Sequence, residues 1–397
     1  MTQNSALRTQ HSRGIRNSLR TLPAAAWILF LGTFVNRFGT FVMPFLVLYL
    51  TRLGYTPARA GLALAAYGTG LLIASLAGGH LADRVGRRNT IAISMFTSTV
   101  AMMALSQARA YGAIVTLAAV AGFAAELYRP AASALIGDLV TPEQRLTAFA
   151  MYRFAVNLGF AAGPATAGFL ADHSFFFLFL GDAVSSAAYG IIALAFLPHG
   201  LRSSGIGERA GEAFRVAIRD RRLMLFLAAT TLVTTVEFQT SSTFPLWVEQ
   251  CGFRGSTYGL LLSINGVLII VFELMMTAWT QRYPAQRMIA LGYFLSGIGV
   301  AMTGLAHSIP ALAATVCVWT LGEMIGSPVT GAYVTHLAPE QYRGHYNGLW
   351  VFAWALALVI GPSLGTLVFQ HSTTALWIGC AAITCVATVL AWWQPSE

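Results

Sequence analysis

Long apolar runs separated by short polar segments dominate this 397-residue sequence. A helix needs about 20 mostly apolar residues to cross a lipid bilayer, and twelve segments come close to that length. We expect them at 24–50, 58–81, 90–107, 111–137, 146–171, 175–197, 222–249, 256–280, 287–306, 310–336, 343–370 and 373–394. The pattern therefore predicts an all-α membrane protein with twelve transmembrane helices.

The composition supports a membrane protein and excludes several other classes. Apolar residues make up 56% of the chain and charged residues only 10%, whereas a soluble fold needs a far more charged surface. The sequence has no nucleotide-binding loop, nucleophile triad or metal-ligand spacing, so we expect neither an enzyme nor a bound metal or cofactor. All 24 basic residues are arginines, spread over alternate loops rather than gathered in one patch. We therefore expect membrane lipids, and not nucleic acid, as the surroundings.

The arginines also predict how the chain is oriented in the membrane. Positively charged residues favour the cytosolic side of a membrane protein. The loops that we place outside contain only Arg52, Arg59, Arg109 and Arg254, whereas the N-terminal segment and the other loops hold most of the rest. We expect a multi-pass protein of the bacterial inner membrane with both termini in the cytosol.

The chain divides into two halves that repeat. A shift of 198 residues places Gly61 on Gly259, and Gly163-Pro164 on Gly361-Pro362. We expect a cytosolic arm, a first six-helix bundle, a cytosolic linker and a second, pseudo-symmetric six-helix bundle at 1–23, 24–197, 198–221 and 222–397. Secondary transporters are often built from such repeats, with the substrate site between them.

A short charged turn interrupts the apolar pattern between the second and third segments. Its marked positions are Gly79, Asp83, Arg84, Gly86, Arg87 and Arg88. Their spacing resembles the loop between helices two and three of the major facilitator superfamily; a merely charged loop would explain the arginines but not Asp83 or the glycines. The resemblance implies a cytosolic latch in which Asp83 lies near the start of the eleventh helix. In the same latch, Arg87 or Arg88 reaches Asp138.

The fifth apolar segment carries a pattern of glycines and one proline, at Gly159, Gly163, Pro164 and Gly168. Glycine permits close contact between membrane helices, and proline removes a backbone hydrogen bond and bends a helix. The pattern resembles the antiporter motif of the same superfamily, which implies proton-driven export. Helix packing alone is the alternative interpretation.

Five charged residues lie midway along predicted helices: Arg37, Glu126, Arg129, Glu237 and Glu323. Each costs about 2.5–3.5 kcal/mol at a helix centre, so its presence needs a reason. One reason is structural ion pairing, of Glu126 with either Arg37 or Arg129. Glu237 and Glu323 have no basic partner midway through the membrane in their own half, which favours a functional role.

The sequence around Glu323 resembles helices ten and eleven of proton-coupled multidrug antiporters. The shared positions are Thr320-Leu321-Gly322-Glu323, Pro328 and Tyr346-Asn347-Gly348. The resemblance implies that Glu323 is a proton and cation site. The arginine that such exporters often carry early in helix four is absent, since Ala118 occupies its position. Either Arg129 or Arg37 takes over its role, or the coupling scheme differs.

Burial of a carboxyl group disfavours its charged form, so embedded acids without a cation are the best candidates for proton exchange. We expect Glu323 to be the principal proton carrier and Glu237 a second carrier or a cation contact. Glu126 is expected to be paired or to face the substrate. The candidate residues of the substrate cavity are Asn36, Arg37, Phe34, Phe38, Phe41, Arg129 and Gln239. The aromatic members recur at helical spacing, which is more typical of packing than of ligand contact.

Together these patterns predict a monomeric exporter that exchanges protons for an amphipathic, cationic small molecule by alternating access. The proton gradient would supply the energy. Two alternatives remain open: an exporter dedicated to one sugar, amino acid or natural product, and a lipid-handling or sensory membrane protein without coupled transport.

Overall fold

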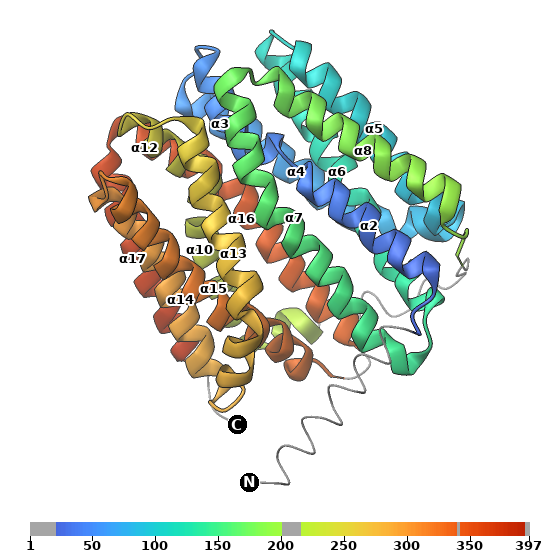
Figure 1. Cartoon of the computed structure of the whole chain (residues 1–397). Helices are drawn as coiled ribbons and strands as arrows, with labels where there is room; N and C mark the ends of the chain where they lie inside the picture. Colours follow the sequence, from blue (N-terminus) through green and yellow to red (C-terminus); the bar gives the residue numbers. More distant parts are fainter. Residues whose placement is uncertain (1–20, 201–215, 340–341, 394–397) are drawn as a thin grey trace.

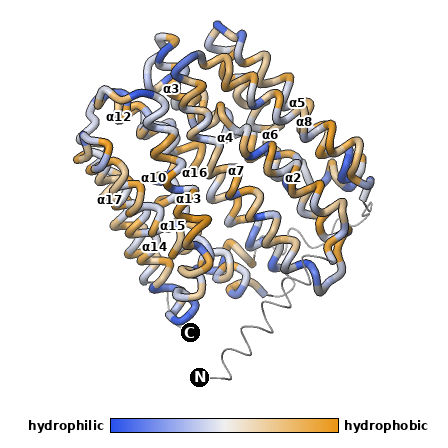
Figure 2. Tube along the Cα trace, viewed as in Figure 1, coloured by the Kyte–Doolittle hydropathy of each residue, from blue (hydrophilic) through white to orange (hydrophobic). Residues whose placement is uncertain are grey.

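The structure, a computed structural model, describes residues 21–200, 216–339 and 342–393. Most of the predicted arm, 1–23, and of the predicted linker, 198–221, lies outside these residues. The described chain is almost entirely helical (Figure 1) and contains twelve helical segments long and apolar enough to cross a membrane. Hydrophilic residues concentrate toward the two ends of the helices (Figure 2). The predicted all-α fold with twelve membrane spans is confirmed.

The helices begin and end close to the predicted limits. In the N-terminal half they are α2 (Ala24–Phe38), α3 (Val42–Arg52), α4 (Pro57–Val85), α5 (Arg87–Gln107), α6 (Tyr111–Leu139), the short η1 (Pro142–Gln144), α7 (Arg145–His173) and α8 (Phe176–Phe196). In the C-terminal half they are α10 (Arg221–Glu237), α11 (Gln239–Ser242), α12 (Phe244–Gln250), α13 (Gly255–Thr280), α14 (Ala285–Ala301), η2 (Met302–Leu305), α15 (Ile309–Leu337), α16 (Arg343–His371) and α17 (Thr373–Trp392).

Two of the spans are interrupted, which the hydropathy pattern did not predict. The first span breaks between α2 and α3, and the seventh breaks between α10, α11 and α12. The two breaks correspond under the 198-residue shift, since Gly39 maps onto Glu237. Discontinuous helices in transporters place backbone groups and side chains at the binding site. The breaks therefore indicate where a site should be sought.

The two halves are joined by two pairs of helices, α4 with α16 and α7 with α13. Small residues make these contacts close: Gly68 lies against Leu358, and Gly266 lies against the backbone of Ala161. Helix α2 begins and α17 ends at one end of the molecule (Figure 1), which we call the termini end. The opposite end contains α12 and the end of α3.

The halves are bridged by hydrogen bonds and an ion pair at the opposite end. Arg52 Nε lies 2.8 Å from Glu249 Oε1. The backbone N–H of Ala58 donates to the Gln370 side chain at 3.3 Å, and that of Ser256 donates to Asp172 Oδ1 at 3.3 Å. Toward the termini end, Arg153 and Asn157 of α7 reach Glu273 of α13. The structure is thus closed at the end opposite the termini.

Candidate functional site

A cavity of about 440 Å³ lies between the two halves. Its polar and aromatic walls come from both, and include Asn36, Arg37, Thr40, Tyr67, Glu126, Arg129, Asn157, Asp182, Phe238, Thr240, Ser241, Asn265, Glu323 and Trp354. Of the predicted site residues, the cavity brings together Asn36, Arg37, Glu126, Arg129 and Glu323. A mostly apolar hollow with a few polar groups is typical of a small-molecule site.

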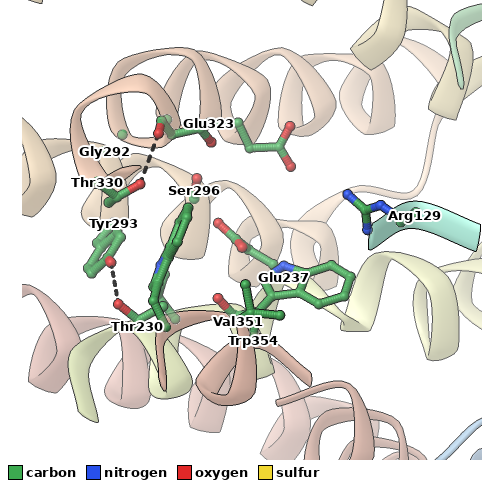
Figure 3. Close-up of a pocket in the computed structure, with 16 residues that line it drawn as sticks. Arg129, Thr230, Glu237, Gly292, Tyr293, Ser296, Glu323, Thr330, Val351 and Trp354 are labelled. Carbon is green, nitrogen blue, oxygen red and sulfur yellow. Dashed lines mark hydrogen bonds between the residues drawn. The ribbon is translucent and has the colours of Figure 1, made fainter. Parts of the chain in front are cut away.

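A second pocket, of about 350 Å³, contains the remaining predicted acid, Glu237. Its polar and aromatic lining includes Thr230, Thr234, Tyr293, Ser296, Ser327, Thr330 and Trp350, from α10, α14, α15 and α16 (Figure 3). Three residues, Arg129, Glu323 and Trp354, line both this pocket and the central cavity. Glu323 therefore stands at the boundary between them.

A hydrogen bond from a neighbouring helix holds one of the two acids of the pocket. Asn265 Nδ2 of α13 donates to Glu323 Oε2 at 2.7 Å and to Thr320 Oγ1 at 3.0 Å. Ser296 of α14 lines the pocket with Glu237, and its hydroxyl donates to the Trp319 carbonyl at 3.4 Å. Within the described residues, neither acid forms an ion pair. The two carboxyl groups are close enough to interact electrostatically, which favours holding one proton or one cation between them.

Arg129 forms an ion pair with Glu126, at 2.6 Å between Nη1 and Oε1. Of the two pairings that the sequence allowed for Glu126, the structure thus contains the one with Arg129. The same arginine faces the pocket of Glu237 and Glu323 (Figure 3). The sequence argument concerned only basic residues in the acids' own half, and it did not foresee that Arg129 lines their pocket from the other half.

Arg37 lies on α2 and faces the cavity without an acidic partner. Its guanidinium lies over the rings of Tyr128 and Phe160, with 5.6 and 5.8 Å from Cζ to the ring centroids. Its Nε is buried and, within the described residues, forms no hydrogen bond.

Asp182 of α8 is a cavity residue that is not among the predicted site residues. It is 4% exposed and accepts a hydrogen bond from the backbone N–H of Val42 at 3.4 Å. It thereby satisfies a donor that the break before α3 leaves without a helical acceptor. Hydropathy does not show which acid lies opposite a helix break. Asp182 could be recognised as a site residue only once the break between α2 and α3 was known.

Four predicted cavity residues are placed elsewhere. Phe34, Phe38 and Phe41 are not among the residues that line the cavity; Phe38 packs on α7 at Gly163, and the ring of Phe41 packs on α8 at Gly181. The aromatic stripe is used for packing, because the face of α2 toward the cavity carries the polar residues.

Gln239 also lies outside the cavity. Its side chain donates to the carbonyls of Thr235, at 2.9 Å, and Gly361, at 3.0 Å. It thus connects the break in the seventh span to α16. The donors of its amide group are engaged in this contact between helices and not in the cavity.

A sequence model of the major facilitator superfamily matches residues 29–258 and 230–397. The chain belongs to the major facilitator superfamily. It is a secondary transporter of this superfamily, and not an enzyme. A solved structure of a peptide-transporter (POT) family member in complex with 5-aminolevulinic acid superposes with a TM-score of 0.79 at 16% identity, over 93% of this chain and 95% of that one.

Relatives in bacteria match over most of their length. An uncharacterised superfamily transporter of Bacillus subtilis, YqjV, is 30% identical over 86% of this chain and 85% of its own. A Na⁺, Li⁺, K⁺/H⁺ antiporter of Planococcus maritimus is 22% identical over 83% and 85%. The multidrug resistance protein MdtH of Cronobacter sakazakii is 21% identical over 88% of each chain.

The charged turn that resembles the superfamily's loop between helices two and three is the junction of α4 and α5. Gly86 has φ of 92°, a backbone conformation that glycine adopts without a steric penalty. Arg87 forms an ion pair with Asp138 of α6, as predicted for one of the two arginines. Arg88 instead lies 2.6 Å from His199, measured from Nη2 to Nε2.

Among the described residues, Asp83 does not dock on the start of α16 as predicted. Asp83 and Arg84 are exposed, and the space around Gly79 is open. Within the described residues, Asp83 forms no hydrogen bond with α16. The contacts between α4 and α16 that involve glycines lie farther from the termini end, at Gly61 and Gly68.

The glycine and proline motif of the fifth span lies where α7 passes between α2 and α13. A methyl group at Gly159 or Gly163 would come within 2.6 Å of the Arg37 side chain or 2.7 Å of the Phe38 carbonyl oxygen. On the other side, Gly168 packs on Gly255, and the carbonyl of Pro164 faces Gly259. The motif therefore supplies close contacts both within the first half and between halves.

Proposed function

We propose that the chain is a proton-coupled exporter of small amphipathic molecules that carry a positive charge. One observation carries this proposal. Glu237 and Glu323 share a pocket that adjoins the central cavity at Glu323, and within the described residues neither has an ion-pair partner. Two enclosed carboxyls in this position can hold a proton or a cation, which is what an exchanger requires.

The exchange follows from the cost of enclosing a charge. A carboxyl group in an apolar cavity is stable as the neutral acid or as a carboxylate beside a cation. A proton and a cationic substrate therefore compete for Glu323. Protonation from outside releases the substrate, and loss of the proton to the cytosol restores the charge that binds the next molecule. With both termini in the cytosol, as the arginines predict, this cycle exports the substrate.

The walls of the pocket favour an organic cation with an apolar body. Trp350 and Trp354 offer aromatic faces, which attract cations, beside the carboxyl groups. The names of two relatives support the proposal: one is a Na⁺, Li⁺, K⁺/H⁺ antiporter and the other a multidrug resistance protein.

Substitution of Glu323 by glutamine tests the proposal. The parent chain in proteoliposomes should concentrate an amphipathic cation, chosen by a growth-inhibition panel, and release protons as it does so. Glu323→Gln should lose this uphill transport and keep downhill exchange, because the amide cannot carry a proton. Asp220→Asn, which removes an acid that caps α10 and lines neither the cavity nor the pocket, is the matched control, since asparagine caps a helix about as well as aspartate. If Glu323→Gln concentrates the cation as the parent does, the assignment is wrong and Glu237 becomes the first candidate.

A further inference from the structure

Arg37 presents an unpaired cation to the central cavity. An arginine remains ionised in proteins, and a charge in the middle of a membrane protein is normally paired or hydrogen-bonded. Within the described residues, however, the Arg37 side chain forms neither an ion pair nor a hydrogen bond. Its contacts are the faces of Tyr128 and Phe160, which attract a cation but accept no strong hydrogen bond.

The acids that act electrostatically on Arg37 already have other partners. Glu126 is bound to Arg129 at 2.6 Å. Asp182 accepts a hydrogen bond from the backbone N–H of Val42 at the break before α3. Neither lies within ion-pair distance of Arg37, so the guanidinium keeps its charge without a neutralising contact.

Two buried tyrosine hydroxyls also lack hydrogen-bond partners within the described residues, those of Tyr128 and Tyr152, and the same holds for Arg37 Nε. Buried donors that lack acceptors cost free energy. Neither tyrosine lines the central cavity, whereas Arg37 does. The Arg37 guanidinium is therefore the donor among these groups that an acceptor in the cavity can reach.

We propose that the transported molecule is an amphipathic zwitterion whose anionic group binds at Arg37. A carboxylate or phosphate group would fit the planar guanidinium, which can donate two parallel hydrogen bonds to such an anion. Its cationic group would lie at the boundary of the C-terminal pocket, beside Glu323. The cationic end of this assignment rests on the proposed function; the anionic end rests on Arg37 alone.

A binding experiment without any ion gradient tests this charge preference. The purified full-length chain is kept in detergent at pH 7, and ligand binding is measured as thermal stabilisation, which grows with affinity. The matched probes are the dipeptide phenylalanyl-phenylalanine, its C-terminal amide, its N-acetyl derivative and the doubly capped form. They share one apolar body and are respectively zwitterionic, cationic, anionic and neutral. A wider library of small aromatic compounds in the same four charge classes accompanies them.

Zwitterions should bind most tightly to the parent chain. Arg37→Gln should weaken zwitterion binding by about thirtyfold or more, since truncating one partner of a buried charge pair has a cost of this size, and should leave the binding of matched cations nearly unchanged. Arg37→Lys should restore part of the preference. Arg254→Gln, in a loop, should change nothing. Each variant is tested only if it elutes as a single folded species in size-exclusion chromatography.

Three results would overturn the inference: cations that bind the parent as tightly as matched zwitterions, a zwitterion preference that survives Arg37→Gln, or no stabilisation by any zwitterion in the library. Zwitterion binding lost in Arg37→Gln, together with uphill transport that survives in Glu323→Gln, would uphold the anion site and reject the proposed coupling. The two proposals therefore fail in different assays.

Discussion

At the break between α2 and α3, the backbone N–H of Val42 has no helical acceptor and donates to Asp182 at 3.4 Å. Ser185, one turn along α8, stands where a side chain at Gly39 would have to lie. The break thus depends on a carboxyl group that arrives from a helix nearly 140 residues away in sequence. Asn36 and Arg37, just before the break, and Thr40, within it, line the cavity.

Removing the Asp182 acceptor should destabilise the first span. We expect Asp182→Ala to cost about 0.5–2 kcal/mol, as the loss of a helix cap does, whereas asparagine caps about as well as aspartate. Asp182→Asn should therefore unfold in detergent near the parent temperature, and Asp182→Ala below it. Equal losses in both variants would show that the charge, rather than the hydrogen-bond acceptor, matters.

Single residues could be predicted from the sequence only in part. A charge in an apolar run is visible, so Arg37, Glu126, Arg129, Glu237 and Glu323 were all found as candidates. Which charges pair was not visible, because hydropathy does not say how two helices are rotated toward each other. The phenylalanines of α2 illustrate this point, since their spacing identifies a helix face but not its neighbour.

Among the elements, α7 is held by backbone contacts on two sides. It packs on α2 through Gly159 and Gly163, and on α13 through Gly168. Helices this close cannot accept larger side chains without moving apart, because the neighbouring atoms are backbone and cannot rotate away.

Gly163→Leu should abolish transport although the chain is still inserted in the membrane. Overpacking costs about 1–3 kcal/mol, which corresponds to about 5- to 150-fold in the balance between two conformations. Gly379→Leu is the control, since the space around Gly379 in α17 is open. Full transport by Gly163→Leu, at equal protein level, would show that the glycine pattern is not required for transport.

At this scale the sequence predicted the number of spans well, and the reason is physical. Crossing the bilayer requires about 20 apolar residues whatever the fold, so each span leaves a trace in hydropathy. A break inside a span leaves none in hydropathy averaged over about 19 residues, since the apolar residues on both sides outweigh the few polar ones at the break. The breaks in the first and seventh spans therefore appeared only in the structure.

The whole molecule is closed at the end opposite the termini, by contacts such as Arg52 with Glu249, and Asp83 is undocked at the other end. An alternating-access transporter must also visit the reverse arrangement. In that arrangement we expect Asp83 to lie at the N-terminus of α16, where the helix dipole stabilises a carboxylate by about 0.3–2 kcal/mol. The sequence predicted the pair of Arg87 with Asp138 but not which arrangement the structure would have.

Asp83→Asn should favour the arrangement closed opposite the termini, by about 2- to 30-fold if the dipole interaction is lost, and slow transport without weakening binding. Spin labels at His80 and His345, both exposed, would report the separation of α4 and α16 after replacement of the four cysteines. Arg52→Gln should shift the distances the other way. Unchanged distances and unchanged transport in Asp83→Asn would contradict the proposed role of Asp83 as a latch.

The hydrogen bond between Asn265 and Glu323 links the protonation of Glu323 to the contact between the two halves. Asn265 is the neighbour of Gly266, which packs directly on the backbone of Ala161 in the other half. A carboxylate accepts this hydrogen bond strongly, and a protonated acid accepts it less well. The Asn265 amide, which binds Glu323, is therefore part of the contact between α13 and α7. Protonation of one oxygen atom of Glu323 would loosen the hold on Asn265 and so change how α13 packs against the other half.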